Sequence, residues 1–138
     1  MIGWLLDTNI LSELRKGRRC DPGVSQWFAR IDDVELFTSV LVLGEIRKGI
    51  ERIRTTDPSQ ARALEKWLQA ISEDYADRIL TVDERVADQW GRLGLRQPLP
   101  VLDALLAATA LCHDLTLVTR DARGLQAAGF QVLNPFSK

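Results

Sequence analysis

The chain has 138 residues, of which 46% are hydrophobic, and a formal net charge of −1 at pH 7. This length and composition suit one domain with a full core over residues 1–138 and leave little room for a second domain. Because positive and negative charges balance, no global basic field indicates nucleic-acid binding. An RNA or DNA partner would have to be attracted by local arginines or bound cations.

The N-terminus and the cysteines bear on the compartment of the protein. Asp7 interrupts the apolar core that a signal peptide needs, and no stretch approaches the roughly 20 apolar residues of a membrane span. Cys20 and Cys112 lie far apart, match no metal-binding spacing and are expected to be reduced thiols. We therefore expect a soluble cytoplasmic protein without membrane association.

Short apolar runs alternate with longer segments of helical periodicity along the chain. Strands are expected at 4–6, 34–38, 79–82, 116–119 and 131–133. Helices are expected at 10–16, 23–31, 42–53, 58–75, 83–95 and 101–113. This alternation predicts an α/β domain with a central, mainly parallel sheet of about five strands. Because the strands are apolar on both faces, helices should cover both sides in a three-layer α/β/α arrangement.

Four acidic residues stand where such a fold could bring them together. In open α/β sheets, ligands bind beyond the carboxyl ends of the strands, and Asp7 and Asp121 each follow an expected strand. Glu45 is one charge in an apolar turn early in a helix, and Asp103 lies in the first turn of the most hydrophobic helix. Taken singly, each acid is also explained as a cap or a surface residue, and Asp103 as a favourable charge near a helix N-terminus.

Four acids that meet without matching lysines would repel one another and raise one another's pKa values. A divalent cation resolves this conflict, and oxygen ligands without histidine or cysteine suit Mg²⁺ or Mn²⁺. Such an ion lowers the pKa of a bound water and stabilises the charge on a phosphodiester under attack. The pattern therefore favours phosphodiester hydrolysis without a protein nucleophile, with Asp7, Glu45, Asp103 and Asp121 as the metal-binding and catalytic residues.

Four stretches add a more specific signal because they occur in a fixed order with sensible separations. They are LLDTNILSELRKG, TSVLVLGEIRKGI, LPVLDALLAATALCHDLTLVTRD and GFQVLNPF. With them the sequence resembles the PIN-domain family, and within it the VapC-type toxins of bacterial toxin–antitoxin pairs, over essentially its whole length.

This resemblance implies a PIN-like fold and a metal-dependent endoribonuclease that acts as the toxin of a type II toxin–antitoxin system. It further implies an RNA substrate, a VapB-type antitoxin as partner and a homodimer. On the matching positions, Asp7, Glu45 and Asp103 look like the three acids that hold Mg²⁺ or Mn²⁺. Asp121 stands where relatives carry Asn or Asp. Many relatives have a further Asp three residues on, before a Phe, whereas this chain has Gly124 and Leu125.

Three polar residues are expected to support the acids. Thr8 and Asn9 match the DTN of the family, and Asn9 would orient a metal-bound water or a carboxylate. Thr119 is expected to line the site. The alternative role for both threonine hydroxyls is helix capping. His113, the single histidine, lies nearly three helical turns from Asp103 and is expected to have a structural role.

Several other features have two interpretations. The basic run 15–19 either contacts phosphates or an acidic partner segment, or is a solvated helix end. Trp67 and Trp90 are expected in the core or a dimer contact rather than as platforms for RNA bases. The helical stripe of Leu64, Trp67, Leu68 and Ile71 is expected to meet a partner subunit.

Three rival functions are alternatives to the ribonuclease, and the residues that each needs can be compared with the sequence. A receiver domain needs an adjacent acidic pair after the first strand and a lysine after the last, whereas Thr8 follows Asp7 and the last strand leads to Asn134. A haloacid-dehalogenase-like phosphatase needs a second Asp two residues after the first, where Asn9 stands. The third rival is a PIN scaffold kept only for binding, which the four acids argue against.

Overall fold

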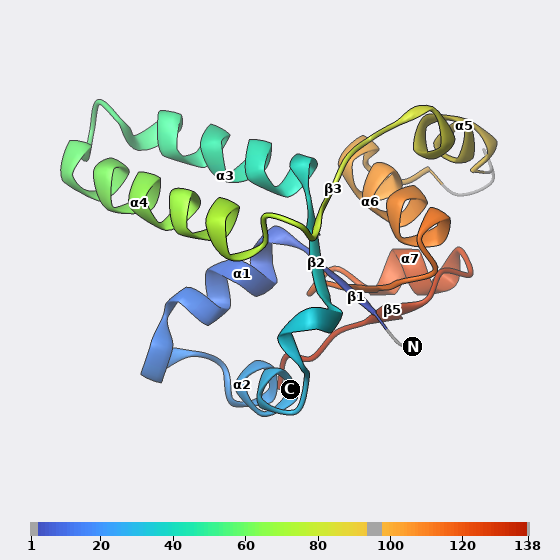
Figure 1. The fold of residues 1–138 in the computed structure, drawn as a ribbon, viewed down its shortest axis with the longest axis horizontal. Helices are drawn as coiled ribbons and strands as arrows, with labels where there is room; N and C mark the ends of the chain where they lie inside the picture. The colour runs from blue at the N-terminus through green and yellow to red at the C-terminus, as the bar shows by residue number, and fades with distance from the viewer. Residues whose placement is uncertain (1–2, 94–97, 138) are drawn as a thin grey trace.

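The computed structural model describes residues 3–93 and 98–137, and five parallel strands lie at its centre (Figure 1). They are β1 (Trp4–Leu6), β2 (Leu36–Ser39), β3 (Ile79–Leu80), β4 (Thr116–Val118) and β5 (Val132–Leu133), arranged in the order β3-β2-β1-β4-β5. The register pairs Leu6 with Val118, so β1 and β4 end side by side at the same edge of the sheet.

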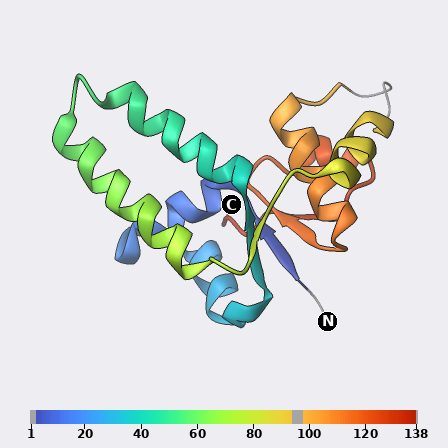
Figure 2. The same cartoon turned by 45° about the horizontal axis from the view of Figure 1, so that its top comes forward.

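Seven α-helices connect these strands within the described ranges. They are α1 (Thr8–Arg15), α2 (Pro22–Ala29), α3 (Val40–Ile53), α4 (Pro58–Asp74), α5 (Glu84–Arg92), α6 (Val101–Cys112) and α7 (Arg123–Ala127). The connections from β1 to β2 and from β2 to β3 run in one direction along the sheet, and those from β3 to β4 and from β4 to β5 run in the other. Connections between parallel strands are right-handed. The first four helices therefore cover one face and the last three the other, as Figures 1 and 2 show. This confirms the predicted three-layer α/β/α arrangement.

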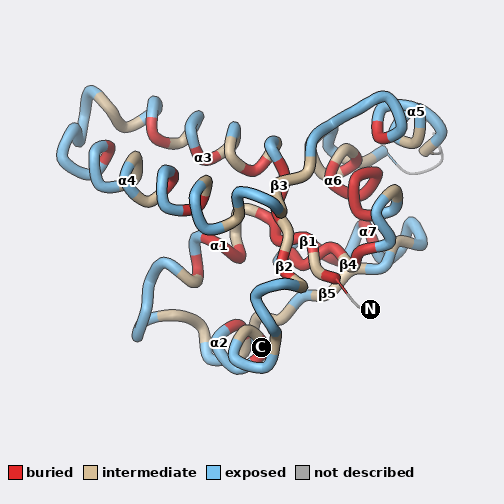
Figure 3. Tube along the Cα trace, in the orientation of Figure 1, coloured by how far each residue is buried: buried red, intermediate tan, exposed pale blue. Residues whose placement is uncertain are grey.

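The apolar runs of the sequence form the core, which gathers on the strands and the inner helix faces (Figure 3). Leu5 and Leu6 of β1 have no exposed surface, as expected for the middle strand of a parallel sheet covered on both faces. On α4, Leu68 and Ile71 are buried in the same core, and Leu64 and Trp67 pack against it. The apolar stripe of α4 thus faces the interior of its own chain.

Some element boundaries differ from those expected. The strand expected at 34–38 begins only at Leu36, because Asp33–Glu35 form a 3-10 turn. Arg78 fixes this entry, since its guanidinium donates to the carbonyl oxygens of Leu36, 2.7 Å away, and Asp74, 2.8 Å away. Helix α7 was not expected, and part of the helix expected at 83–95 lies outside the described residues.

The C-terminal segment folds back onto the start of α2. The backbone N–H of Ser137 donates to Asp21 Oδ2 at 2.8 Å, and the Ser137 hydroxyl donates to the other oxygen of the same carboxylate. A Cβ at Gly23 would lie 2.4 Å from the carbonyl oxygen of Pro135, so only glycine permits this approach. Of the helices in the described ranges, none has both the length and the apolar composition needed to cross a bilayer.

Candidate active site

The candidate site lies where the connections of the sheet change direction, between β1 and β4. The chain leaves β1 toward β2 on one side and returns to β4 on the other, which opens a crevice beyond the carboxyl ends of both strands. A cleft of about 440 Å³, named here the acid cleft, occupies this place. It is lined by Asp7, Thr8, Asn9, Ser12, Glu13, Lys16, Glu45, Asp103, Arg120, Asp121 and Phe136. The structure thus brings all four predicted acids to one cleft.

Asp7 is the most deeply buried of the four acids, with 7% of its surface exposed. It is the N-cap of α1: its Oδ1 accepts from the backbone N–H of Thr8 at 2.7 Å. The Thr119 hydroxyl donates to its Oδ2 at 2.8 Å. Burial raises the pKa of Asp7, and the negative charges of Glu45 and Asp103 raise it further, against the lowering by these two hydrogen bonds.

Glu45 reaches the cleft from the second turn of α3, whose start is fixed by the Ser39 side chain accepting from the Leu41 N–H at 3.0 Å. The Thr8 hydroxyl donates to the Glu45 carboxylate and so joins α1 to α3. Asp7, not Thr8, supplies the cap of α1, so the capping alternative for Thr8 was wrong.

Asp103 and Asp121 form the more open side of the cleft. Asp103 is half-buried in the first turn of α6, and Asp121 is exposed after β4. Burial raises the pKa of Asp103, and the charges of Asp121 and Glu45 raise it further. Burial and then the charges of neighbouring acids thus raise the pKa values of Asp7 and Asp103.

Thr119 supports the acid cleft without being among its lining residues, and only 1% of its surface is exposed. Besides donating to Asp7, its hydroxyl oxygen accepts from the Asp121 N–H at 3.2 Å and from Asn9 Nδ2 at 3.4 Å. Asn9 Oδ1 accepts from the Arg120 N–H at 3.1 Å. Asn9 thus holds the loop after β4, while Thr119 ties that loop to Asp7.

Sequence reasoning missed three of the residues that line the cleft, Ser12, Glu13 and Phe136. Glu13 is 7% exposed and accepts from Lys16 Nζ at 3.0 Å and from the Asp21 N–H at 2.8 Å, and these hydrogen bonds lower its pKa. Its place between the apolar residues of LSEL was the available signal. Phe136 lies in the matched stretch GFQVLNPF, and the Arg120 guanidinium carbon stands 4.6 Å from its ring centroid.

Other singled-out residues lie outside the cleft. Arg15 of the basic run stacks over the Trp67 ring at 5.5 Å, and residues 17–19 form an exposed 3-10 turn. Trp90 is 42% exposed on α5. His113 is the C-cap of α6, at the end of that helix opposite Asp103, so the structure does not bring it to the acids.

Charge pairing separates the four acids from the other carboxylates. Among residues 3–93 and 98–137, the ion pairs involve Glu13, Glu51, Glu65, Asp77 and Asp88, and none involves the four. In the same ranges, no three His, Cys, Asp or Glu side chains approach as closely as the ligands of one metal ion. The acids are thus unpaired neighbours rather than a closed metal cage.

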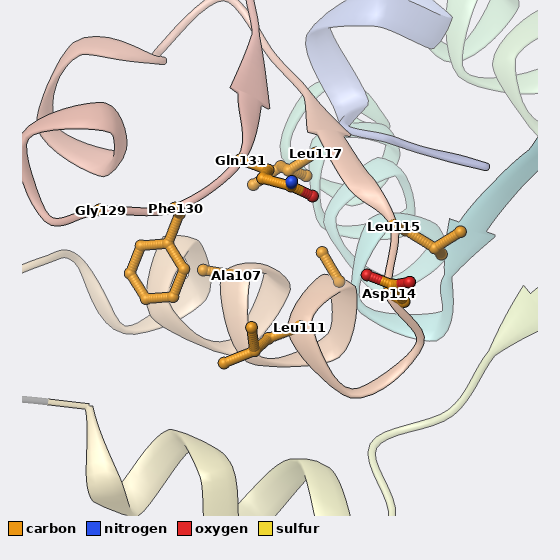
Figure 4. Close-up of a pocket in the computed structure, with 9 residues that line it drawn as sticks. Ala107, Leu111, Asp114, Leu115, Leu117, Gly129, Phe130 and Gln131 are labelled. Carbon is orange, nitrogen blue, oxygen red and sulfur yellow. The ribbon is translucent and has the colours of Figure 1, made fainter. Parts of the chain in front are cut away.

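A second hollow of about 380 Å³ lies away from the acids, between α6 and the segment before β5 (Figure 4). Figure 4 shows Leu111, Leu117 and Phe130 around it, with Asp114 at one end. Its lining is mainly apolar and brings no second titratable group to Asp114. It therefore offers none of the chemistry found in the acid cleft.

Comparisons with known proteins match nearly the whole chain. The family model of the PIN domain matches residues 4–131. Toxin FitB of Neisseria gonorrhoeae is 29% identical over 96% of this chain and 97% of its own length. VapC ribonuclease Y4jK of Sinorhizobium fredii is 28% identical over 96% of each chain. The crystal structure of FitAcB from Neisseria gonorrhoeae has a TM-score of 0.85 at 30% identity, covering 96% of this chain and 97% of that one.

Proposed function

The chain belongs to the PIN-domain family, and we propose that it is a metal-dependent endoribonuclease that cuts RNA at the acid cleft as the toxin of a toxin–antitoxin pair. The observation that carries this proposal is the convergence of Asp7, Glu45, Asp103 and Asp121 on one cleft, where no ion pair within the described ranges involves any of them. Toxin and ribonuclease are the names of two relatives that match nearly the whole chain. Membership of the family removes the receiver-domain and phosphatase alternatives.

The donor set of the cleft fits a hard divalent cation. Carboxylate oxygens are the ligands that Mg²⁺ and Mn²⁺ accept, and burial together with the charges of neighbouring acids raises the pKa values of Asp7 and Asp103. Mg²⁺ needs only one or two direct carboxylates and keeps several waters, which suits four acids that stand apart. We propose that Asp7, Glu45, Asp103 and Asp121 hold the ion, directly or through water. When bound, it would activate water and stabilise charge on the phosphodiester.

The chain's own residues then have distinct tasks. Asp7 is fixed because both its oxygens accept hydrogen bonds, from Thr8 at 2.7 Å and Thr119 at 2.8 Å. Thr8 fixes Glu45 in the same way. Thr8, Asn9 and Thr119 are thus the supporting residues, since each orients an acid or the loop that carries one. Asp103 and Asp121 are left facing the open cleft, where the RNA would enter.

The decisive experiment is cleavage of a fluorescent single-stranded RNA by the purified protein with Mn²⁺ or Mg²⁺. Asp7→Asn keeps the size of the side chain, removes its charge and should reduce the rate at least about 10³-fold. Asp77→Asn, which changes an acid 88% exposed outside the cleft, is the matched control and should cleave like the parent. Parental cleavage by Asp7→Asn, or cleavage that EDTA does not stop, would refute the proposal. A DNA strand of the same sequence tests whether RNA is the substrate.

The partners follow from the same proposal. The resemblance to VapC-type toxins implies a VapB-type antitoxin, a homodimer and a cytoplasmic site of action. Light scattering of the purified chain, alone and with the product of a neighbouring antitoxin gene, tests both associations. A monomer that no such product binds or inhibits would contradict this part and leave the cleavage reaction untouched.

A further inference from the structure

Arg120 stands at the junction of the acid cleft with a third hollow, different from the one in Figure 4. This third hollow, named here the flank cleft, has a volume of about 680 Å³. Its lining residues are Pro98, Leu99, Pro100, Asp103, Arg120, Asp121, Ala122, Arg123, Gly124, Leu125, Gln126 and Asn134. Because Asp103, Arg120 and Asp121 line both hollows, the two form one continuous groove past the acids.

Arg120 is held in place from three directions. Its backbone N–H donates to Asn9 at 3.1 Å, and its carbonyl oxygen accepts from Asn134 Nδ2 at 3.3 Å. Its guanidinium lies 4.6 Å from the centroid of the Phe136 ring. Phe136 in turn is placed by its own N–H, which donates to Asn134 Oδ1 at 3.0 Å. A cation–π contact of this kind orients the guanidinium plane.

The donors of this guanidinium are not used by the protein. Within residues 3–93 and 98–137, no carboxylate lies at ion-pair distance from Arg120, and its side chain donates no hydrogen bond. Lys16, the other cation of the acid cleft, is already paired with Glu13 at 3.0 Å. Arg120 therefore offers an oriented set of N–H donors beside the four acids, in the geometry that suits a phosphate.

The flank cleft differs in charge from the acid cleft. Beyond the shared residues its lining contains Arg123 and no further acid. Position 124, where many relatives carry Asp, is glycine, and the side chain nearest to an added Cβ there is Leu99 at 3.8 Å. The groove thus changes from strongly acidic in the acid cleft to balanced in charge in the flank cleft, where Arg120 and Arg123 face Asp103 and Asp121.

We propose that Arg120 is a positioning residue that binds the phosphate next to the one that is cut, and that Arg123 receives the following phosphate in the flank cleft. This inference rests on the proposed ribonuclease function. A phosphate beside four carboxylates is repelled, and Arg120 offsets that repulsion while fixing the strand. Among the residues that the structure describes, Arg120 and Arg123 are the cations that line the flank cleft. Two cations in a groove suit a single-stranded RNA segment rather than a duplex, whose backbone needs a broad basic surface.

Salt dependence of RNA binding provides the first test. Binding of a fluorescent single-stranded RNA is measured in EDTA, where the protein does not cut, from 50 to 300 mM salt. Each lost phosphate contact should reduce the slope of log Kd against log salt by about 0.7. Arg120→Ala and Arg123→Ala should each show that loss and bind about 10-fold more weakly at low salt. Arg62→Ala, at an exposed arginine of α4, should keep the parental slope.

Steady-state cleavage then separates position from charge. Arg120→Lys and Phe136→Leu keep the positive charge but lose the stacked plane, so the salt slope should stay parental. KM should rise about 3- to 10-fold in both variants while kcat changes less, because the strand is bound but poorly fixed. Thermal unfolding shows whether each variant is folded, and Arg120, being exposed, should tolerate replacement.

The outcomes distinguish this inference from the proposed function. If the parent cleaves RNA and the Arg120 variants keep its slope and KM, the inference is wrong and the ribonuclease proposal stands. If the parent binds RNA with an Arg120-dependent slope but never cuts it, the binding role stands and the proposed function fails. If the parent neither binds nor cuts RNA, both are overturned.

Discussion

Two carboxylates of helix α3, Glu45 and Glu51, belong to groups with opposite electrostatic surroundings. Glu45 belongs to the acid cleft and has no cationic partner in the described part of the chain. Six residues later, Glu51 belongs to an ion network with Arg47, Arg54 and Glu65, named here the hairpin network. Its contacts include Arg47 to Glu65 at 2.8 Å and Arg54 to Glu51 at 2.6 Å.

The pKa shifts of the two groups run in opposite directions. In the hairpin network, hydrogen bonds from Arg54 and then Arg47 lower the pKa of Glu65 to about 2. In the acid cleft, burial and like charges raise the pKa values of Asp7 and Asp103. A network of matched charges contributes to the fold, whereas repelling acids oppose it, and a chain gains from such acids only through what they bind.

The largest difference between the two groups should appear when a hydrogen-bond donor to the carboxylates is removed from each. Thr119→Val deletes the donor to Asp7 and should lower RNA cleavage about 10- to 100-fold, the range for residues that orient metal ligands. Because this hydrogen bond lowers the pKa of Asp7, its loss should also move the acid limb of the pH–rate profile to higher pH. Arg54→Gln, which deletes donors to Glu51 and Glu65, should change cleavage less than 2-fold. If both variants lost RNA cleavage equally, the acid cleft and the hairpin network would not differ in their roles.

A smaller effect should appear when a divalent cation is added to the folded protein. At a Mg²⁺ or Mn²⁺ concentration ten times Kd, binding to the native state stabilises it by about 1.4 kcal/mol and raises Tm by about 4–6 °C. Asp103→Asn should reduce this rise, and Glu65→Gln should keep it whole. Calorimetry of the three proteins with and without the cation measures it. An equal rise in Asp103→Asn would show that the cation binds elsewhere.

The acids could be predicted because their signals are local. Asp7 ends an apolar strand and Asp103 opens an apolar helix, so each position is readable from a few neighbouring residues. The strand order that joins them also follows from short-range rules, since right-handed crossovers leave few arrangements of alternating strands and helices. The resemblance to the PIN-domain family then selected these acids among many.

The contacts that orient the acids could not be predicted, because they join distant parts of the chain. Thr8 meets Glu45 across 37 positions and Thr119 meets Asp7 across 112, and no periodicity encodes such pairs. Phe136 meets Arg120 across 16 positions, in a segment held by hydrogen bonds to Asn134 and, through Ser137, to Asp21 at the start of α2. Helix α7 has five residues and no side-chain cap, too little for a periodic signal.

The smallest predicted effect is a difference in the sign of the pH dependence of stability. The folded-state pKa of Asp103 lies above its ordinary value of 3.8, so the folded state binds the proton more tightly than the unfolded state. Ionisation of Asp103 therefore opposes folding, and its destabilising effect grows as pH rises through and above 3.8. Glu65, with a pKa of about 2 against an ordinary 4.5, contributes stability above pH 4.5 that is lost as pH falls toward 2.

Urea unfolding in EDTA between pH 3 and 7 separates these two contributions. The free energy of unfolding of the parent minus that of Asp103→Asn should fall as pH rises from about 4. The free energy of unfolding of the parent minus that of Glu65→Gln should rise between pH 3 and 4.5. Each change should be a few tenths of a molar in the urea midpoint, roughly a tenth of a typical value. If both differences rose with pH, both acids would be paired in the folded protein. Opposite slopes would mean that the acid cleft, without a cation, is held together against its own charge by the burial of β1 and α6 around it.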